Sequence, residues 1–116
     1  MEKNVKVSIL LEIYGELLTK TQYQFLDDYY NSDLSLSEIA ENKNITRQAV
    51  RDTIKQGENK LFELEEKLKI MQKTIKQEKK IANILSEITK IQTQFSDEQI
   101  ADMLEHIKNE LNCVMQ

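Results

Sequence analysis

Residues 34–55, LSLSEIAENKNITRQAVRDTIK, contain the strongest fold signals of this chain. Ser35 and Glu38 match a capping box, in which a hydroxyl and a carboxylate three residues later bind the free amides at a helix start. The polar run 42–44 stops that helix, because asparagine adopts the left-handed backbone conformation at low cost. Thr46 then caps a second helix. Two helices separated by so few residues must turn on each other, which predicts a helix-turn-helix.

The apolar side chains of both predicted helices agree with this turn. Ile39 and Ala40 belong to the inner face of the first helix. Val50 and Ile54 occupy the facing positions of the second, and Ile45 is expected to fill the corner between the helices. The polar side chains that remain on the outer face of the second helix are Arg47, Gln48, Arg51, Asp52 and Lys55.

The outer face of the second helix favours contact with nucleic acid. Arg47, Arg51 and Lys55 recur every four residues as a positive stripe, which contains both arginines of the chain. Arginine presents a rigid fork of donors that suits phosphates and bases, and the Gln48 amide could read adenine. Asp52 repels phosphate, and a merely solvated charged face remains the alternative. The candidate nucleic-acid-binding residues are Thr46, Arg47, Gln48, Arg51 and Lys55.

Composition restricts the classes of protein that the chain could belong to. Of its 116 residues 31% are charged, and the net charge is −4, although residues 43–80 carry eleven basic and six acidic side chains. Two glycines and no proline argue against glycine-rich phosphate loops and turn-rich β folds. No apolar run reaches the roughly 18 residues of a membrane span, and no secretory signal is recognisable. We expect a cytoplasmic, all-α protein without membrane insertion.

The chain offers little for catalysis or metal binding. The single histidine, His106, lies off the apolar face of its predicted helix, and nothing near the single cysteine, Cys113, would activate it. The acidic pairs at 27–28 and 65–66 are adjacent on helices, so their side chains diverge instead of converging on a metal. We therefore expect no enzymatic activity, no metal site and no cofactor.

Two helices are predicted ahead of the helix-turn-helix. Apolar residues recur at helical spacing from Ile9 to Leu18. Thr21 and Gln24 match another capping box, which would open the second of these helices. The expected inner face of that second helix consists of Phe25, Leu26, Tyr29 and Tyr30.

The second half of the chain is typical of long amphipathic helices. A heptad seam continues from Ile54, and a second seam further on is out of phase with it. We expect a break or kink at the mismatch, residues 76–80. One unbroken helix from Thr46 to Thr93 would be about 70 Å long and would project far beyond any core that a chain of this size can build. The first seam comprises Leu61, Leu64, Leu68, Met71 and Ile75, and the second comprises Ile81, Ile84, Ile88, Ile91 and Phe95.

A last helix is predicted after a capping box at Ser96 and Gln99. These apolar seams are long, and the chain offers few helices for them to pack against. This favours a homodimer, with a compact monomeric bundle as the alternative. The sequence thus divides into a helix-turn-helix domain, residues 1–60, and a helical extension for packing or dimerisation, residues 61–116. The side chains expected to be buried on the last helix are Ile100, Met103, Leu104, Ile107, Leu111 and Val114.

The stretches LLEIYGELLTKTQ at 10–22, SLSEIAE at 35–41 and ITRQAVRDTIK at 45–55 together resemble the YlxM-like family of small bacterial proteins. Residues 18–61 also resemble region 4 of bacterial sigma factors. In sigma region 4 the second helix of the motif enters the DNA major groove. That resemblance implies a DNA-facing position for each of the five candidate residues named above. The other sigma regions are absent, so we do not expect the chain alone to direct a polymerase.

The resemblance to the YlxM-like family implies a regulatory helix-turn-helix protein associated with the signal recognition particle pathway. Genes of that family lie beside those for the particle's GTPase and its receptor. The implied partners are DNA, that GTPase, its receptor or the particle's RNA. Two alternatives stay open: a sequence-specific transcriptional regulator unrelated to protein targeting, and a helical adaptor that binds no DNA.

Overall fold

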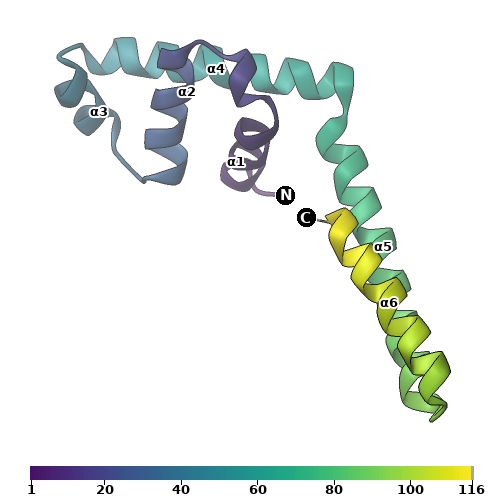
Figure 1. The fold of residues 1–116 in the computed structure, drawn as a ribbon. Coiled ribbons are helices and arrows are strands. Elements are labelled where there is room, and N and C mark those ends of the chain that lie inside the picture. Colours follow the sequence, from purple (N-terminus) through teal and green to yellow (C-terminus); the bar gives the residue numbers. More distant parts are fainter. Residues whose placement is uncertain (116) are drawn as a thin grey trace. The chain divides into compact units, whose positions relative to one another are not determined.

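The computed structural model describes residues 1–115, which form six α-helices and contain no strand (Figure 1). This confirms the predicted all-α fold class. The chain divides into two compact units, Met1–Met71 and Gln72–Gln116. The α-helices are α1 (Lys3–Tyr14), α2 (Lys20–Leu26), α3 (Leu36–Lys43), α4 (Arg47–Leu68), α5 (Ile70–Gln94) and α6 (Glu98–Met115), with a 3-10 turn η1 (Gly15–Leu17) and a π-helical segment η2 (Asp27–Asn31).

In the first unit, α1, α2 and α3 pack against the long helix α4 (Figure 1). The side chains between them are apolar and nearly all excluded from solvent, which supplies the main driving force for folding this unit. The boundary predicted from the sequence, between residues 1–60 and 61–116, lies inside α4. The buried core consists of Val7, Leu10, Leu11, Tyr14, Phe25, Leu26, Ile39, Ala40, Val50, Ile54 and Leu61.

The close crossing of α2 and α4 depends on Gly57. A Cβ atom added at Gly57 would lie 2.7 Å from Cδ1 of Leu26, which is too close for two carbon atoms. Leu26 itself is completely buried. The missing side chain at Gly57 therefore lets α2 approach the backbone of α4, at the usual cost of glycine inside a helix.

The start of α2 differs from the prediction. The Oγ1 atom of Thr19 accepts a hydrogen bond from the Gln22 N–H, and the Gln22 side chain accepts one from the Thr19 N–H, both at 3.1 Å. The predicted cap at Thr21 was wrong. The sequence contains two overlapping Thr-x-x-Gln patterns, and the chain becomes extended at Leu18, so the earlier threonine takes the cap position.

The C-terminal ends of α1 and α2 also differ from the prediction. α1 ends at Tyr14, and the remaining residues up to Leu17 form a 3-10 turn instead of continuing the helix. After α2 the backbone widens into the π-helical segment η2. Tyr29 is consequently exposed and Tyr30 half-buried, although both were expected on the inner face.

The long helical region breaks at Lys69. Its φ of 56° is left-handed, so α4 ends at Leu68. α5 then continues without interruption through residues 76–80, where the break was expected. That prediction was therefore wrong by several residues, because the charged run is compatible with a solvated helix and phase mismatch alone does not end one.

The break is held in place by a buried hydrogen-bond network in the first unit. The Tyr14 hydroxyl donates to Oε1 of Glu65 at 2.8 Å and accepts from the Ile70 N–H at 3.2 Å. The same Glu65 atom accepts from the Met71 N–H at 3.0 Å. These bonds satisfy two amides at the start of α5. Burial, and then the Glu65 carboxylate, raise the pKa of Tyr14, so its hydroxyl remains a neutral donor.

The break also interrupts the heptad seam predicted for residues 61–75. Leu61 and Met71 are buried, whereas Leu68 is 46% exposed. Leu64 and Ile75 are half-buried. The five residues therefore do not form one straight stripe, and Leu61 belongs to the core of its own chain.

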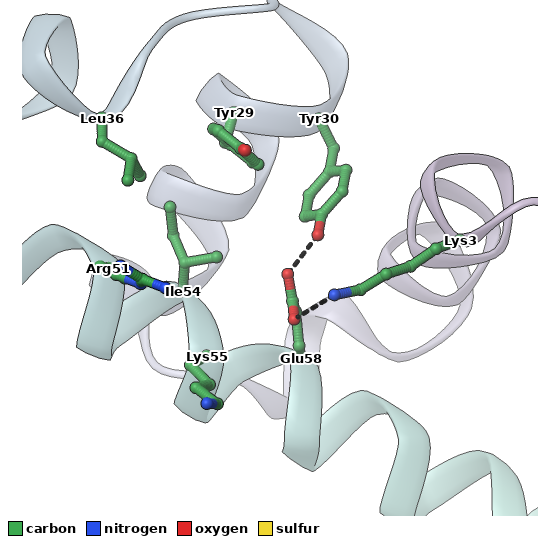
Figure 2. Close-up of a pocket in the computed structure, with 8 residues that line it drawn as sticks. All are labelled: Lys3, Tyr29, Tyr30, Leu36, Arg51, Ile54, Lys55 and Glu58. Carbon is green, nitrogen blue, oxygen red and sulfur yellow. Dashed lines mark hydrogen bonds and ion pairs between the residues drawn. The ribbon is translucent and has the colours of Figure 1, made fainter.

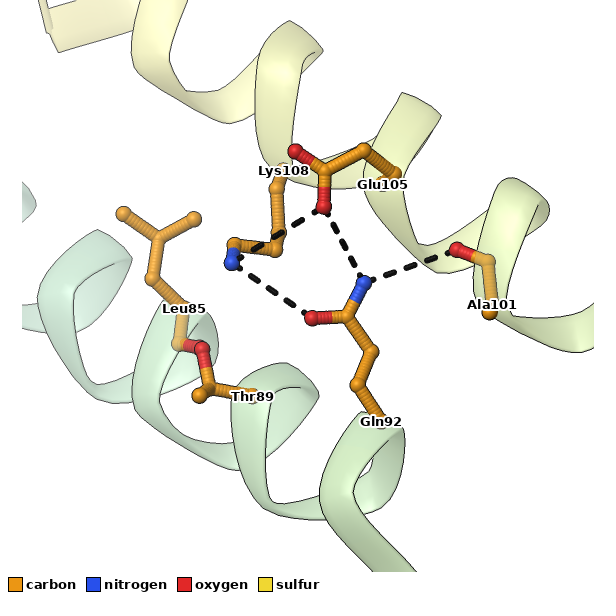
Figure 3. Close-up of polar contacts among 6 residues, drawn as sticks. All are labelled: Leu85, Thr89, Gln92, Ala101, Glu105 and Lys108. Atoms are coloured by element: carbon orange, nitrogen blue, oxygen red, sulfur yellow. Dashed lines mark hydrogen bonds and ion pairs between the residues drawn. The ribbon is translucent and has the colours of Figure 1, made fainter. Parts of the chain in front are cut away.

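In the second unit, α5 and α6 form an antiparallel hairpin. Figure 3 shows Gln92 of α5 reaching α6 with both ends of its amide, donating to Glu105 Oε2 at 3.2 Å and accepting from Lys108 Nζ at 3.4 Å. Asp97 starts α6 by accepting from the Gln99 N–H at 2.9 Å. The predicted capping box at Ser96 was therefore misplaced by one residue.

Candidate nucleic-acid interface

The first helix of the helix-turn-helix is α3, and its predicted capping box is confirmed. Ser35 Oγ accepts from the Glu38 N–H at 3.1 Å, and Glu38 Oε1 accepts from the Ser35 N–H at 3.2 Å. Asn44 ends the helix with a left-handed φ of 57°, as predicted. The next amide, of Ile45, donates back to the Ala40 carbonyl at 3.0 Å. Local sequence thus determines where α3 starts and stops.

Thr46 opens α4 as predicted, with its hydroxyl accepting from the Ala49 N–H at 3.1 Å. The expected inner faces of both helices are buried. Ile45 is an exception, because it is 41% exposed and borders a surface hollow with Phe25 instead of filling the corner. The side chains that do fill the contact between α3 and α4 are Ile39, Ala40, Val50 and Ile54.

The left-handed turn at Asn44 leads to a stability prediction. Asn44→Ala is expected to lower the free energy of unfolding by about 1 kcal/mol, because alanine pays more than asparagine for this conformation. Asn44→Gly should be as stable as the wild type or slightly more so, since glycine is the preferred residue after a helix end. Urea unfolding followed by circular dichroism measures both. Equal loss in the two variants would contradict the backbone explanation.

The exposed face at the start of α4 carries the positive stripe. Arg47, Arg51 and Lys55 are all exposed. Among residues 1–115 none of the three is paired with a carboxylate, although lysines form three ion pairs with glutamates elsewhere in that range. Their positive charges are therefore available to a polyanion, since no internal partner has to be displaced first.

Gln48 lies beside the stripe and is held by its own helix. Its amide nitrogen donates to Oδ1 of Asp52 at 2.9 Å, one turn further along. Both side chains are exposed. Gln48 can therefore read a base with its amide only if it gives up or shares the bond to Asp52.

A hollow of about 350 Å³ borders the stripe, and the carboxylate among the residues that line it is Glu58 (Figure 2). The Tyr30 hydroxyl donates to Glu58 Oε1, and Lys3 Nζ lies 3.3 Å from Glu58 Oε2. Burial, and then the carboxylate, raise the pKa of Tyr30. Because Lys3 and Tyr30 occupy Glu58, that carboxylate is not left to neutralise Arg51 and Lys55, which precede it on α4.

The roles of Glu58 and Glu65 were not predicted from the sequence. Both glutamates lie at core-facing positions of α4 and are at most 9% exposed. The signal was present in the spacing, because Glu58 and Glu65 fall three or four residues from Ile54 and Leu61 on the apolar face. A carboxylate in that position requires hydrogen-bond partners from another element.

In residues 1–115 no three histidine, cysteine, aspartate or glutamate side chains gather as a metal site would require. No helix in that range is long and apolar enough to cross a membrane.

A family model and several known proteins of one helix-turn-helix family are similar to this chain. A family model described as "UPF0122: Putative helix-turn-helix protein, YlxM / p13 like" matches residues 1–111. A UPF0122 protein of Acetivibrio thermocellus is 38% identical over 116 residues, covering 100% of this chain and 99% of its own length. One from Clostridium kluyveri is 47% identical over 111 residues, 94% and 95% of the two chains. One from Listeria welshimeri is 41% identical over 108 residues, 93% and 96%.

Proposed function

Because the chain belongs to the UPF0122 family of YlxM / p13-like helix-turn-helix proteins, we propose that it is a non-enzymatic regulator that binds double-stranded DNA. The contact surface is the exposed face at the start of α4. The observation that carries this proposal is the stripe of three unpaired cations, Arg47, Arg51 and Lys55, on the second helix of the motif.

Each residue of the stripe has a role that its chemistry allows. The two arginines can bind phosphate oxygens or the O6 and N7 atoms of guanine with two donors at once. Lys55 is a point charge, suited to phosphate. Thr46 acts indirectly, since its hydroxyl fixes the start of the helix that carries the others. Gln48 supplies base reading only after its bond to Asp52 is exchanged.

Salt dependence of binding tests the proposal. Binding to a labelled random duplex, followed by fluorescence anisotropy, should weaken with a log–log slope of about −3 if three phosphates are contacted. Arg47→Ala/Arg51→Ala should reduce that slope by about two and weaken binding at least about tenfold at low salt. The double variant should keep its helicity, because both side chains are exposed.

A matched control removes equal charge elsewhere. Lys79→Ala/Lys90→Ala deletes two exposed cations from α5 and should leave affinity and slope nearly unchanged. Equal losses in the two double variants would show general charge attraction instead of a defined interface. No binding of the wild type at low salt would remove the DNA proposal.

The carboxylate of Asp52 favours a second candidate function, because it repels phosphate in the middle of the proposed DNA surface. In this alternative the protein regulates the signal recognition particle pathway by binding the particle's GTPase or its receptor. The resemblance to the YlxM-like family supports it. Measuring GTP turnover of the particle with its receptor, with and without this protein, tests the alternative. Unchanged GTP turnover would argue against this alternative. For either function we propose that the protein acts in the cytoplasm.

A further inference from the structure

The α5–α6 hairpin has a well-defined inward face. The Gln92 amide, which also donates to the Ala101 carbonyl at 3.5 Å, fixes how the two helices are rotated about their axes (Figure 3). Ile81 and Ile88 are each only 7% exposed. The residues turned toward the partner helix are Ile81, Leu85, Ile88 and Gln92 on α5, and Ala101, Leu104, Lys108 and Leu111 on α6.

A second set of apolar side chains on the hairpin remains exposed. This corrects the prediction for the last helix, whose expected core residues are mostly on the surface, and for the second seam. The apolar pattern was real, but it is wide enough for two faces, and the hairpin buries only one. The exposed apolar face consists of Ile84, Ile91, Phe95, Ile100, Met103, Ile107 and Val114, which are 40% to 67% exposed.

These exposed residues lie on one side of the hairpin. Ile84 and Ile91 each precede an inward residue of α5 by one position, and Ile100, Met103 and Ile107 do the same on α6. A step of one residue rotates a side chain by about 100° in a right-handed helix. Because the two helices are antiparallel, the same rotation turns both sets toward the same side. The result is one continuous apolar face.

The exposed apolar face is large for a surface without a partner. Its seven side chains present on the order of 600 Å² of apolar surface, at the upper end of what monomeric proteins expose in one patch. A standard interface buries roughly 800 Å² from each partner. With its polar margins the face thus approaches the area that a stable dimer needs.

Charge identifies the partner that fits this face. α5 carries five basic and two acidic side chains, a net charge of +3, whereas α6 carries four acidic side chains and one lysine, a net charge of −3. Lys76 and Lys80 extend the stripe of Ile84 on α5. Glu110 lies between Ile107 and Val114 on α6, and all three charged residues are exposed.

We propose that the exposed apolar face binds the same face of a second copy, giving an antiparallel four-helix bundle. A two-fold axis parallel to the helices places α5 of one copy against α6 of its partner, so that opposite charges meet. An axis perpendicular to the helices would stack α5 on α5 and oppose like charges. Bundles of this kind bury apolar stripes from four neighbouring helices in one core.

Sedimentation equilibrium of the full chain tests the proposal. The wild type should show a concentration-dependent mass that approaches twice 13.6 kDa. Met103→Glu/Ile107→Glu should raise the dimer dissociation constant at least about 100-fold, because it buries four carboxylates in the new core. The matched control, Asn109→Glu/Asn112→Glu, adds the same charge to exposed positions of α6 outside the apolar face and should still dimerise.

A charge exchange tests the pairing of α5 with α6. Lys80→Glu and Glu110→Lys should each weaken the dimer, and the two together should restore it. This comparison decides the matter even if the Met103→Glu/Ile107→Glu protein loses helicity by circular dichroism. A wild-type protein that stays monomeric, a helical Met103→Glu/Ile107→Glu protein that still dimerises, or a charge exchange without recovery would each overturn the proposal.

Discussion

Leu26→Ala is expected to lower the free energy of unfolding by about 3 kcal/mol. Leu26 is completely buried where α2 crosses α4, and deleting buried methyl groups costs both their transfer energy and a residual cavity. The cavity cannot close easily, because the capped start of α2 holds that helix in position. Urea unfolding of the variant, followed by circular dichroism at 222 nm, measures the loss.

The close approach at Gly57 makes this prediction more specific. Gly57→Ala alone should be mildly destabilising, since its Cβ would press on Leu26 and outweigh the gain of about 1 kcal/mol in helix propensity. In the Leu26→Ala background the same Cβ enters the empty space. Gly57→Ala should therefore stabilise the Leu26→Ala protein. Additive losses in the double-mutant cycle would contradict the close crossing.

Glu65→Ala should also cost about 3 kcal/mol of unfolding free energy. The carboxylate is buried, and its Oε1 atom accepts from both the Tyr14 hydroxyl and the Met71 amide. Removing it leaves two donors without this acceptor at the junction of α4 and α5. Bonds to a charged group contribute more than neutral ones, and unsatisfied buried donors add their desolvation cost. Thermal or urea unfolding measures the effect.

Two variants separate this network from a general charge effect. Glu65→Gln keeps an oxygen at the position of Oε1 and should lose less than half as much stability. Glu63→Ala removes an exposed carboxylate whose partner is Lys67 on the same helix, and its stability should not change measurably. A Glu65→Ala protein as stable as Glu63→Ala would show that the network does not hold the junction.

The helix-turn-helix was predictable because its signals are local. Capping residues act within three positions of a helix end, so Ser35, Asn44 and Thr46 could be assigned from the sequence alone. Even local rules fail when two patterns overlap. Thr19 and Thr21 both match a capping box, and only the path of the preceding turn selects between them.

The break at Lys69 was not predictable by the same rules. It depends on Tyr14, which lies 51 residues before Glu65 and meets it only after α1 has packed on α4. Periodicity likewise reveals that α6 has a broad apolar face, but not which of the two adjacent stripes on that face packs against α5. That choice depends on the polar bonds of Gln92, which join the two helices across the hairpin.

The candidate interface was predictable in part. The spacing of Arg47, Arg51 and Lys55 indicates a shared face, and the structure leaves all three exposed and without carboxylate partners. The hollow beside them could not be predicted from the sequence, because Lys3 and Tyr30 come from elements far away in the sequence. Their bonds to Glu58 explain how a carboxylate can lie near the stripe without neutralising it.

Amide chemical shifts of the labelled protein, mapped during titration with a DNA duplex, test whether the helix-turn-helix binds DNA. We expect the perturbed amides to lie in the turn and the first half of α4, residues 44–55, and to lose their response in Arg47→Ala/Arg51→Ala. Perturbations restricted to α5 and α6, or an unchanged spectrum at low salt, would contradict DNA binding through the helix-turn-helix.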